Sequence, residues 1–230
     1  MSAILFDFNG TMIFDSPIVE RSWVEFFKRY NIEVTMEELR PYMHGVDPID
    51  TVDHYFPNIT RERNGELVDE IEQLYLDLCL EYAGGLYSFA KGLEDFLDKC
   101  KEKNIKMTIA TAAPLKNVKF FFRTLHLDKW FNFEDVVFCD GSFPGKPNPT
   151  IYLMAAKKLN TPIEDCVIFE DAISGITAAV RSKCKYVFGL TSLLTEKEIL
   201  DLGADKAIND YTDQEFLFSI LEKWPIKYFL

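Results

Sequence analysis

The pattern of apolar and polar positions divides the chain into a helical part and a part in which strands and helices alternate. Between residues 16 and 82 the apolar side chains recur at helical spacing, and helices are predicted at 17–27, at 35–39 behind a Thr-x-x-Glu capping box, and at 66–80. Beyond Gly84-Gly85, short β-like runs alternate with amphipathic helices. Together with the opening run 3–8, the predicted strands are 107–111, 136–140, 166–170, 186–188 and 206–208.

This alternation predicts an α/β fold, with a doubly wound parallel sheet covered by helices on both faces. The opening run belongs to that sheet, because a lone parallel strand cannot bury both of its faces against a helical bundle. We therefore predict a core domain formed by residues 1–15 and 85–230. A small all-helical cap, residues 16–84, is inserted after the first strand, and Gly and small polar residues at the joints would allow hinge motion.

Composition and charge narrow the classes of partner. The chain of 230 residues is 48% hydrophobic, which is ample for a packed core. Its 25 basic and 37 acidic residues give a net charge of −12, which disfavours nucleic acid and anionic membranes as partners. An anionic substrate would therefore need local cations. We expect a monomer or weak dimer that binds a small molecule.

Cysteine usage and hydropathy bear on the compartment. The 5 cysteines include no CxxC pair, and most lie in apolar stretches, where a thiol acts as a small core residue. No charged-then-apolar leader precedes the first strand, and no apolar run approaches the ~20 residues that span a bilayer. These features favour a reduced, cytoplasmic protein that is neither secreted nor inserted in a membrane.

Polar residues gather where the predicted strands end. Asp7 closes the first strand in DFNGT, Thr111 closes the second and is followed by Ala112, and Glu170-Asp171 close the fourth. Lys146 lies in the loop after the third strand, in GKPNP. Because the carboxyl ends of parallel strands meet along one crevice, we expect these residues to lie together.

These residue types suit phosphoryl transfer. A carboxylate held among backbone N–H groups can attack phosphorus and form an aspartyl-phosphate, and Asp7 is the candidate nucleophile. Positioning and charge neutralisation supply most of the remaining catalysis. The candidate phosphate-binding groups are Thr111, Ala112, Lys146, Asn9 and Gly10, and the candidate Mg2+ ligands are Asp7, the Asn9 carbonyl, Glu170 and Asp171. Each alone has an ordinary structural interpretation, such as a turn, a solvated lysine or a helix N-cap, but their joint placement at strand ends favours a site.

These same residues carry a family resemblance. DFNGT, the Thr of MTIATAAP, the Lys of GKPNP and the Glu-Asp of VIFEDAISG resemble the four motifs of the haloacid dehalogenase superfamily. The helical insert after the first motif, with GLEDFLDKCKEKNIKMTIAT and FEDAISGITAAV, is similar to the β-phosphoglucomutase and small-molecule phosphatase branch. The resemblance implies a Rossmann-like core, Mg2+ dependence, an Asp nucleophile and a mobile cap that helps to choose the substrate.

Asn9 departs from that pattern. In the phosphatases and mutases that the chain resembles, the first motif is Asp-x-Asp, and its second Asp protonates the leaving group and later activates water. An amide can donate N–H but cannot transfer a proton at neutral pH, and general acid–base assistance is typically worth ~10²- to 10⁴-fold. We therefore expect a phosphatase that is slow or selective for good leaving groups.

Several alternatives stay open at this stage. Asp15 or Glu20 could replace the missing acid, Asn9-Gly10 could deamidate to an aspartate, or the protein could have lost turnover and act as a phosphate-binding or regulatory module. A phosphosugar mutase is a further alternative. The cap disfavours it, because Val19 or Glu20 and Pro48 stand where the resembled mutases have a histidine and an arginine. His44 and His54 are interpreted as structural residues.

Overall fold

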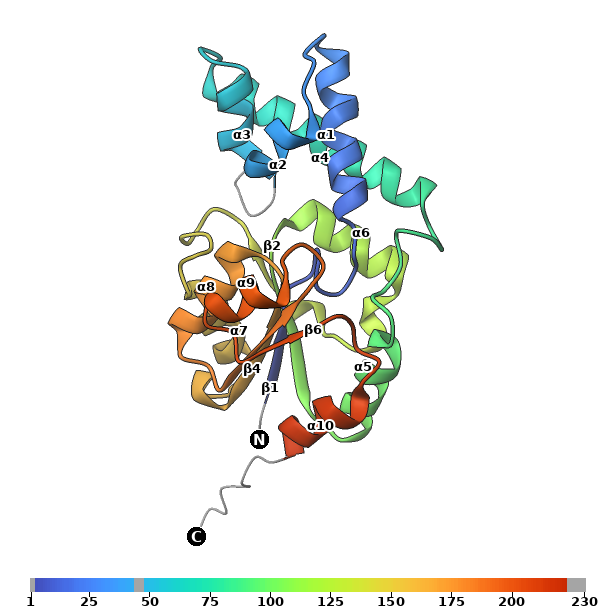
Figure 1. Cartoon of the computed structure of the whole chain (residues 1–230), viewed down its shortest axis with the longest axis vertical. Helices are drawn as coiled ribbons and strands as arrows, with labels where there is room; N and C mark the ends of the chain where they lie inside the picture. The colour runs from blue at the N-terminus through green and yellow to red at the C-terminus, as the bar shows by residue number, and fades with distance from the viewer. Residues whose placement is uncertain (1–2, 44–47, 223–230) are drawn as a thin grey trace. The chain divides into compact units, whose positions relative to one another are not determined.

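The β-like runs form one parallel sheet with the strand order β3-β2-β1-β4-β5-β6. The strands are β1 (Ala3–Phe6), β2 (Lys106–Pro114), β3 (Val137–Cys139), β4 (Cys166–Glu170), β5 (Tyr186–Leu190) and β6 (Lys206–Ile208). The first strand therefore lies in the middle of the sheet, between β2 and β4 (Figure 1). Strand order reverses at β1, and doubly wound sheets bind ligands at such a point. The predicted fold class is confirmed.

The computed structural model describes residues 3–43 and 48–222. By their contacts, the residues divide into two compact units. The sheet unit comprises Met1–Ile13 and Phe89–Leu230, and the helical unit comprises Phe14–Ser88. Among the helices of the described ranges, none is long and apolar enough to cross a membrane.

Helices cover both faces of the sheet (Figure 1). The helices of the sheet unit are α5 (Leu93–Glu102), α6 (Leu115–Leu125), α7 (Thr150–Lys158), α8 (Ile173–Ser182), α9 (Glu196–Asp201) and α10 (Gln214–Glu222), with short 3-10 turns at Leu127–Lys129, Phe133–Asp135 and Ile163–Asp165. Successive side chains of a strand point to opposite faces. Leu5 and Ile168 thus pack with residues of α7, α8 and α9 in one apolar cluster.

Aromatic rings form the opposite face of the sheet. Phe6, Phe169 and Phe188 occupy neighbouring positions in the register of β1, β4 and β5. Their rings stack across the strands, with centroids 5.2 Å apart for the first pair and 4.8 Å for the second. Phe96 of α5 packs edge-on against Phe169 and contacts Phe218 of α10. This aromatic layer fixes the register of the central strands, because a one-residue slip would turn every ring to the other face.

Four of the predicted strands differ from the observed ones by one to three residues at an end, and the differences in β1 and β2 bear on the site. β1 ends at Phe6 and not at residue 8, because the Phe8 carbonyl already accepts turn hydrogen bonds from the N–H groups of Thr11 and Met12. β2 continues to Pro114, which pairs with Cys139 of β3. Ala112 therefore lies within β2.

The helical unit contains α1 (Ser16–Arg29), α2 (Met36–Met43), α3 (Pro48–Tyr55) and α4 (Arg61–Glu81). α2 begins at the predicted capping box, in which the Glu38 N–H donates to Thr35 Oγ1 and the Thr35 N–H donates to Glu38 Oε2. The helix α3 was not predicted, and α4 begins five residues before the predicted 66. Phe26 and Phe27 of α1 pack against the ring of Phe56, just after α3.

Candidate active site

Asp7 lies directly after β1, at the carboxyl edge of the sheet. Its N–H donates to the Phe169 carbonyl at 3.0 Å, which continues the pairing of β1 with β4 by one residue. The chain then turns through Gly10, whose φ of +76° favours glycine. A Cβ at Gly10 would lie 2.0 Å from Asp171 Oδ2, so the absent side chain also lets the turn approach the fourth strand. Glycine is thus required there twice over.

Lys146 links two of the carboxylates. Its Nζ lies 2.6 Å from Asp7 Oδ1 and 2.6 Å from Glu170 Oε1, although these residues are separated by 139 and 24 positions in the chain. The lysine and glutamate side chains are 7% and 1% exposed, so both ion pairs lie away from water. Burial alone would lower the pKa of Lys146, but the charges of Asp7 and Glu170 outweigh it and raise that pKa above its ordinary value. The lysine therefore stays a cation.

Glu170 is held by four donors. Oε1 accepts from Lys146 and from the Tyr152 hydroxyl, the latter at 2.9 Å. Oε2 accepts from the N–H groups of Asp171 and Ala172, at 2.7 and 2.9 Å. Because side chains two residues apart in a strand point to the same face, β4 sets the direction of the Glu170 side chain. Glu170 points to the same face as Ile168, which is the face covered by α7 and α8.

Asp171 is a buried carboxylate bound by hydroxyl groups. Thr11 Oγ1 donates to its Oδ1 at 3.1 Å, and Ser192 Oγ donates to its Oδ2 at 3.2 Å. Burial, followed by the nearby charges of Glu170 and Asp7, raises the pKa of Asp171 well above its ordinary value. A divalent cation at this point would offset the repulsion between the carboxylates.

The three acids form a candidate cation site. One oxygen each of Asp7, Glu170 and Asp171 lies within 4.8 Å of the others, and all three residues are buried. Magnesium prefers oxygen ligands and commonly uses one or two carboxylates with water and substrate phosphate. The donor set therefore fits Mg2+. Asp7 and Asp171 are the carboxylates that fit best, since both oxygens of Glu170 already accept two hydrogen bonds each.

The remaining predicted site residues lie in the turn after β1 and in β2. Asn9 is half-buried and forms an isolated bridge with Ile13 within the turn after β1. Thr111 is buried in β2, the neighbour of β1, and its Oγ1 accepts from the Ala113 N–H at 3.1 Å. Ala112, between Thr111 and Ala113, is exposed. The predicted roles of these residues in binding phosphate remain predictions.

Three polar residues of the site were not predicted from the sequence: Thr11, Tyr152 and Ser192. Ser192 follows β5, so inspection of every strand end would have found it. Thr11 directly follows Gly10 in the first motif. Tyr152 carried no comparable signal, because it is a buried residue of α7 in an apolar cluster.

The sequence predicts structural roles for His44 and His54. The His54 ring stacks on the Tyr42 ring with their centroids 4.2 Å apart, as expected of a structural residue. His44 lies outside the described residues.

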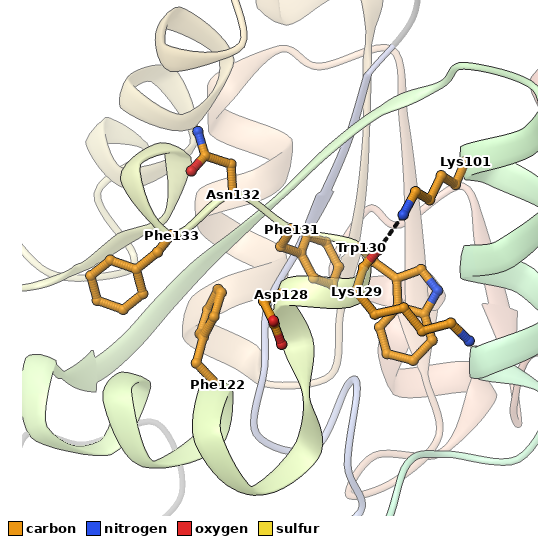
Figure 2. A pocket seen from close by; sticks show the side chains of 8 residues that line it. All are labelled: Lys101, Phe122, Asp128, Lys129, Trp130, Phe131, Asn132 and Phe133. Atoms are coloured by element: carbon orange, nitrogen blue, oxygen red, sulfur yellow. Dashed lines mark hydrogen bonds between the residues drawn. The ribbon is translucent and has the colours of Figure 1, made fainter.

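A separate pocket of about 510 Å³ lies beside the segment that follows α6 (Figure 2). Its lining includes the rings of Phe122, Trp130 and Phe133 and the cations Lys101 and Lys129. The Lys101 ammonium donates to the Lys129 carbonyl at 2.6 Å, and the Lys129 ammonium pairs with Asp98 at 3.0 Å. None of the predicted site residues lines this pocket, and both of its cations already have partners. The carboxylate cluster is therefore the better candidate for the active site.

Comparison with known proteins agrees with this architecture. A family model for haloacid dehalogenase-like hydrolases matches residues 1–182. A crystal structure of a HAD hydrolase, family IA, variant 3, from Entamoeba histolytica is 34% identical and superposes with a TM-score of 0.87, over 96% of this chain and 99% of that one.

Two curated proteins are more distant. The phosphorylated carbohydrates phosphatase of Thermotoga maritima is 28% identical over 89% of this chain and 92% of its own length. The chloroplastic protein SUPPRESSOR OF QUENCHING 1 of Arabidopsis thaliana is 28% identical over 91% of this chain, but the chain spans only 20% of that protein's length.

Proposed function

Because the chain belongs to the haloacid dehalogenase-like hydrolase family, we propose that it is a Mg2+-dependent phosphohydrolase that acts on a small phosphorylated metabolite through an aspartyl-phosphate. One observation carries the proposal. Lys146 bridges Asp7 and Glu170 at 2.6 Å each, with Asp171 alongside, so a nucleophile, a fixed cation and carboxylate ligands occupy one buried cluster. A purely structural salt bridge would not need three acids around one lysine.

The residues divide the work as follows. Asp7 attacks the phosphorus through one carboxylate oxygen, and the bond from phosphorus to the leaving-group oxygen breaks. Lys146 and the N–H groups around Asn9 and Gly10 stabilise the charge on the transferred group. When bound by Asp7, Asp171 and the Asn9 carbonyl, Mg2+ would neutralise further charge on the phosphoryl oxygens. Water then attacks the phosphorus, the bond from phosphorus to the Asp7 oxygen breaks, and inorganic phosphate leaves with the Asp7 carboxylate regenerated.

Asn9 limits the rate of this cycle. Its amide can donate an N–H to the substrate but cannot give a proton to a departing alkoxide or remove one from the attacking water. We infer slow turnover of alkyl phosphates and faster turnover of acyl or aryl phosphates, whose leaving groups need little protonation. The Thermotoga relative is named for phosphorylated carbohydrates, which are alkyl phosphates. A phosphorylated carbohydrate is therefore the substrate class to test first, with a low rate expected.

Asn9 also supports a second candidate function, a module that binds a phosphorylated ligand without turnover. The buried Asp7–Lys146 pair argues against it, because a simple anion site would not retain a carboxylate beside its cation. A mutase is a weaker alternative, since Pro48 opens α3 where the resembled mutases have an arginine.

Hydrolysis assays and a binding assay distinguish these three functions. We would measure hydrolysis of acetyl phosphate, p-nitrophenyl phosphate and a panel of sugar phosphates with and without Mg2+, and we would measure binding of fluoroberyllate with Mg2+ by thermal shift. Mg2+-dependent release of inorganic phosphate supports the phosphohydrolase. Stabilisation by fluoroberyllate without turnover of any substrate favours the binding module, and an isomeric sugar phosphate as product favours the mutase.

A further inference from the structure

The proposed chemistry assigns no role to the hydroxyl of Tyr152, which lies in this buried cluster. Tyr152 lies on α7, six residues after Lys146, and its side chain is fully buried. The hydroxyl donates to Glu170 Oε1 at 2.9 Å, the same oxygen that accepts from Lys146. The Tyr152 ring also lies beside the lysine, with Nζ 5.2 Å from the ring centroid. One side chain therefore contacts both members of the ion pair.

Glu170 has no lone pair left for a further partner in this arrangement. A carboxylate offers about four acceptor positions, and Glu170 uses them for Lys146, Tyr152 and two backbone N–H groups. Asp171 differs, because each of its oxygens accepts a single hydroxyl. The two adjacent acids are therefore set for different tasks.

We propose that Tyr152 is a positioning residue whose hydroxyl fixes Glu170 as the counter-ion of Lys146, which leaves Asp7 and Asp171 as the carboxylates that face a metal. Lys146 is shared between Glu170 and Asp7. Without the tyrosine hydroxyl, Oε1 would have the lysine as its one side-chain donor and would draw the ammonium away from Asp7. This inference rests on the proposed phosphohydrolase function and adds a determinant of how the site holds its cationic side chain.

Tyr152→Phe deletes the hydroxyl and keeps the ring. We expect it to weaken binding of inorganic phosphate, measured by calorimetry at saturating Mg2+, by ~10-fold. It should lower kcat by ~10- to 100-fold, because a misplacement of about 1 Å of a group such as the Lys146 ammonium can cost up to ~10²-fold in rate. The Kd for Mg2+ alone should stay within about 3-fold, because Tyr152 touches neither proposed metal carboxylate.

Tyr186→Phe is the matched control. Tyr186 begins β5 in the same unit, and its hydroxyl makes no hydrogen bond within the described ranges 3–43 and 48–222. It should change each of these quantities by less than about 2-fold, and the melting temperature of both variants shows whether the fold is kept.

Glu170→Gln and Asp171→Asn separate positioning from metal ligation. Glu170→Gln should leave the Kd for Mg2+ alone within about 3-fold, whereas Asp171→Asn should raise it by more than ~10-fold. Adding Tyr152→Phe to Glu170→Gln should cost less than about 2-fold more in phosphate affinity, since the interaction it serves is already weakened.

Three results would overturn the proposal: a Tyr152→Phe variant that binds phosphate as tightly as the parent, an equal effect of that substitution in the parent and in the Glu170→Gln background, or a loss of Mg2+ affinity in Glu170→Gln that matches Asp171→Asn. A parent that binds Mg2+ and phosphate but turns over no substrate would count against the proposed function alone. The binding measurements would still decide the role of Tyr152.

Discussion

Gly175 contacts Glu170 at the first turn of α8, where a Cβ would lie 1.7 Å from Glu170 Oε1 and 1.9 Å from its Cδ. No rotation of a methyl group relieves an overlap of that size. The glycine therefore makes the space in which the carboxylate meets Lys146 and Tyr152.

Gly175→Ala should displace Glu170 and with it Lys146. Overpacking of this kind typically costs ~1–3 kcal/mol of unfolding free energy, and turnover should fall at least ~10-fold because the ammonium loses its position beside Asp7. Urea unfolding and steady-state kinetics measure the two effects. Gly65→Ala in α4 is the control, because a Cβ there would point into open space, with nothing outside the backbone of its own helix within 4 Å. It should instead stabilise the fold by roughly 1 kcal/mol. A Gly175→Ala enzyme with parental stability and rate would contradict the packing argument.

Asp7→Asn should abolish turnover while the fold is kept. The amide cannot form the acyl phosphate, whereas Lys146 keeps its pair with Glu170. Mass spectrometry of acid-quenched parent protein should show a phosphoryl adduct on the peptide that contains Asp7, and the variant should show none. A variant that retains more than a few per cent of the parental rate would remove Asp7 from the role of nucleophile.

Mg2+ should raise the melting temperature of the parent, and EDTA should reverse the rise. Burial first, and then the charges of Glu170 and Asp7, raise the pKa of Asp171. A bound divalent cation would offset that repulsion and stabilise the folded state that binds it. Asp171→Asn removes one of the repelling charges, so its apo form should melt no lower than the parent while its response to Mg2+ is lost. If EDTA-treated protein hydrolysed a good substrate at the untreated rate, the metal assignment would be wrong.

Asn9→Asp should restore a proton donor. Turnover of alkyl phosphates should rise by ~10²-fold or more, a barrier change of roughly 3 kcal/mol, with a smaller gain for acyl phosphates. The same acid would activate water, so a burst of phosphoenzyme in the parent should clear faster in the variant. A leaving-group series at saturating Mg2+ makes the comparison. Equal slopes for both proteins would mean that another residue supplies the proton.

The buried tyrosines should make the fold sensitive to alkali. Burial raises the pKa of Tyr75, Tyr152 and Tyr211 well above 10. The negative charge of Asp15 adds to this effect for Tyr75, and the carboxylates of the candidate site add to it for Tyr152 and Tyr211. Each stays protonated in the folded chain but ionises in the unfolded chain, so stability is complete below pH 10 and falls above it by ~1.4 kcal/mol per pH unit per tyrosine. Urea unfolding between pH 8 and 11 measures the slope, which Tyr75→Phe should reduce. If absorbance at 295 nm showed all 10 tyrosines of the folded protein ionising together near pH 10, the prediction would fail.

Local pattern was sufficient for the fold class. Strands of a parallel sheet are buried on both faces, so each appears as a short apolar run between helical segments, and runs such as 166–170 could be placed without any tertiary information. The exact ends of the strands depended on backbone pairing with neighbouring segments. β2 continues to Pro114 because β3 lies beside it, and β1 ends at Phe6 because the Phe8 carbonyl accepts hydrogen bonds within the turn that follows.

The sequence by itself determined which chemical groups stand at the strand ends: Asp7, Lys146 and the Glu170-Asp171 pair. Tertiary structure decided how these groups are used. Glu170 and Asp171 are neighbours in the chain, yet the two-residue period of β4 directs Glu170 toward α7 and α8, while Asp171 meets hydroxyls from the turn after β1 and the loop after β5. Tyr152 and Ser192 entered the site because side chains 18 and 21 residues away were brought into contact. Such contacts arise from register and from the packing of helices on the sheet, and no local pattern encodes them.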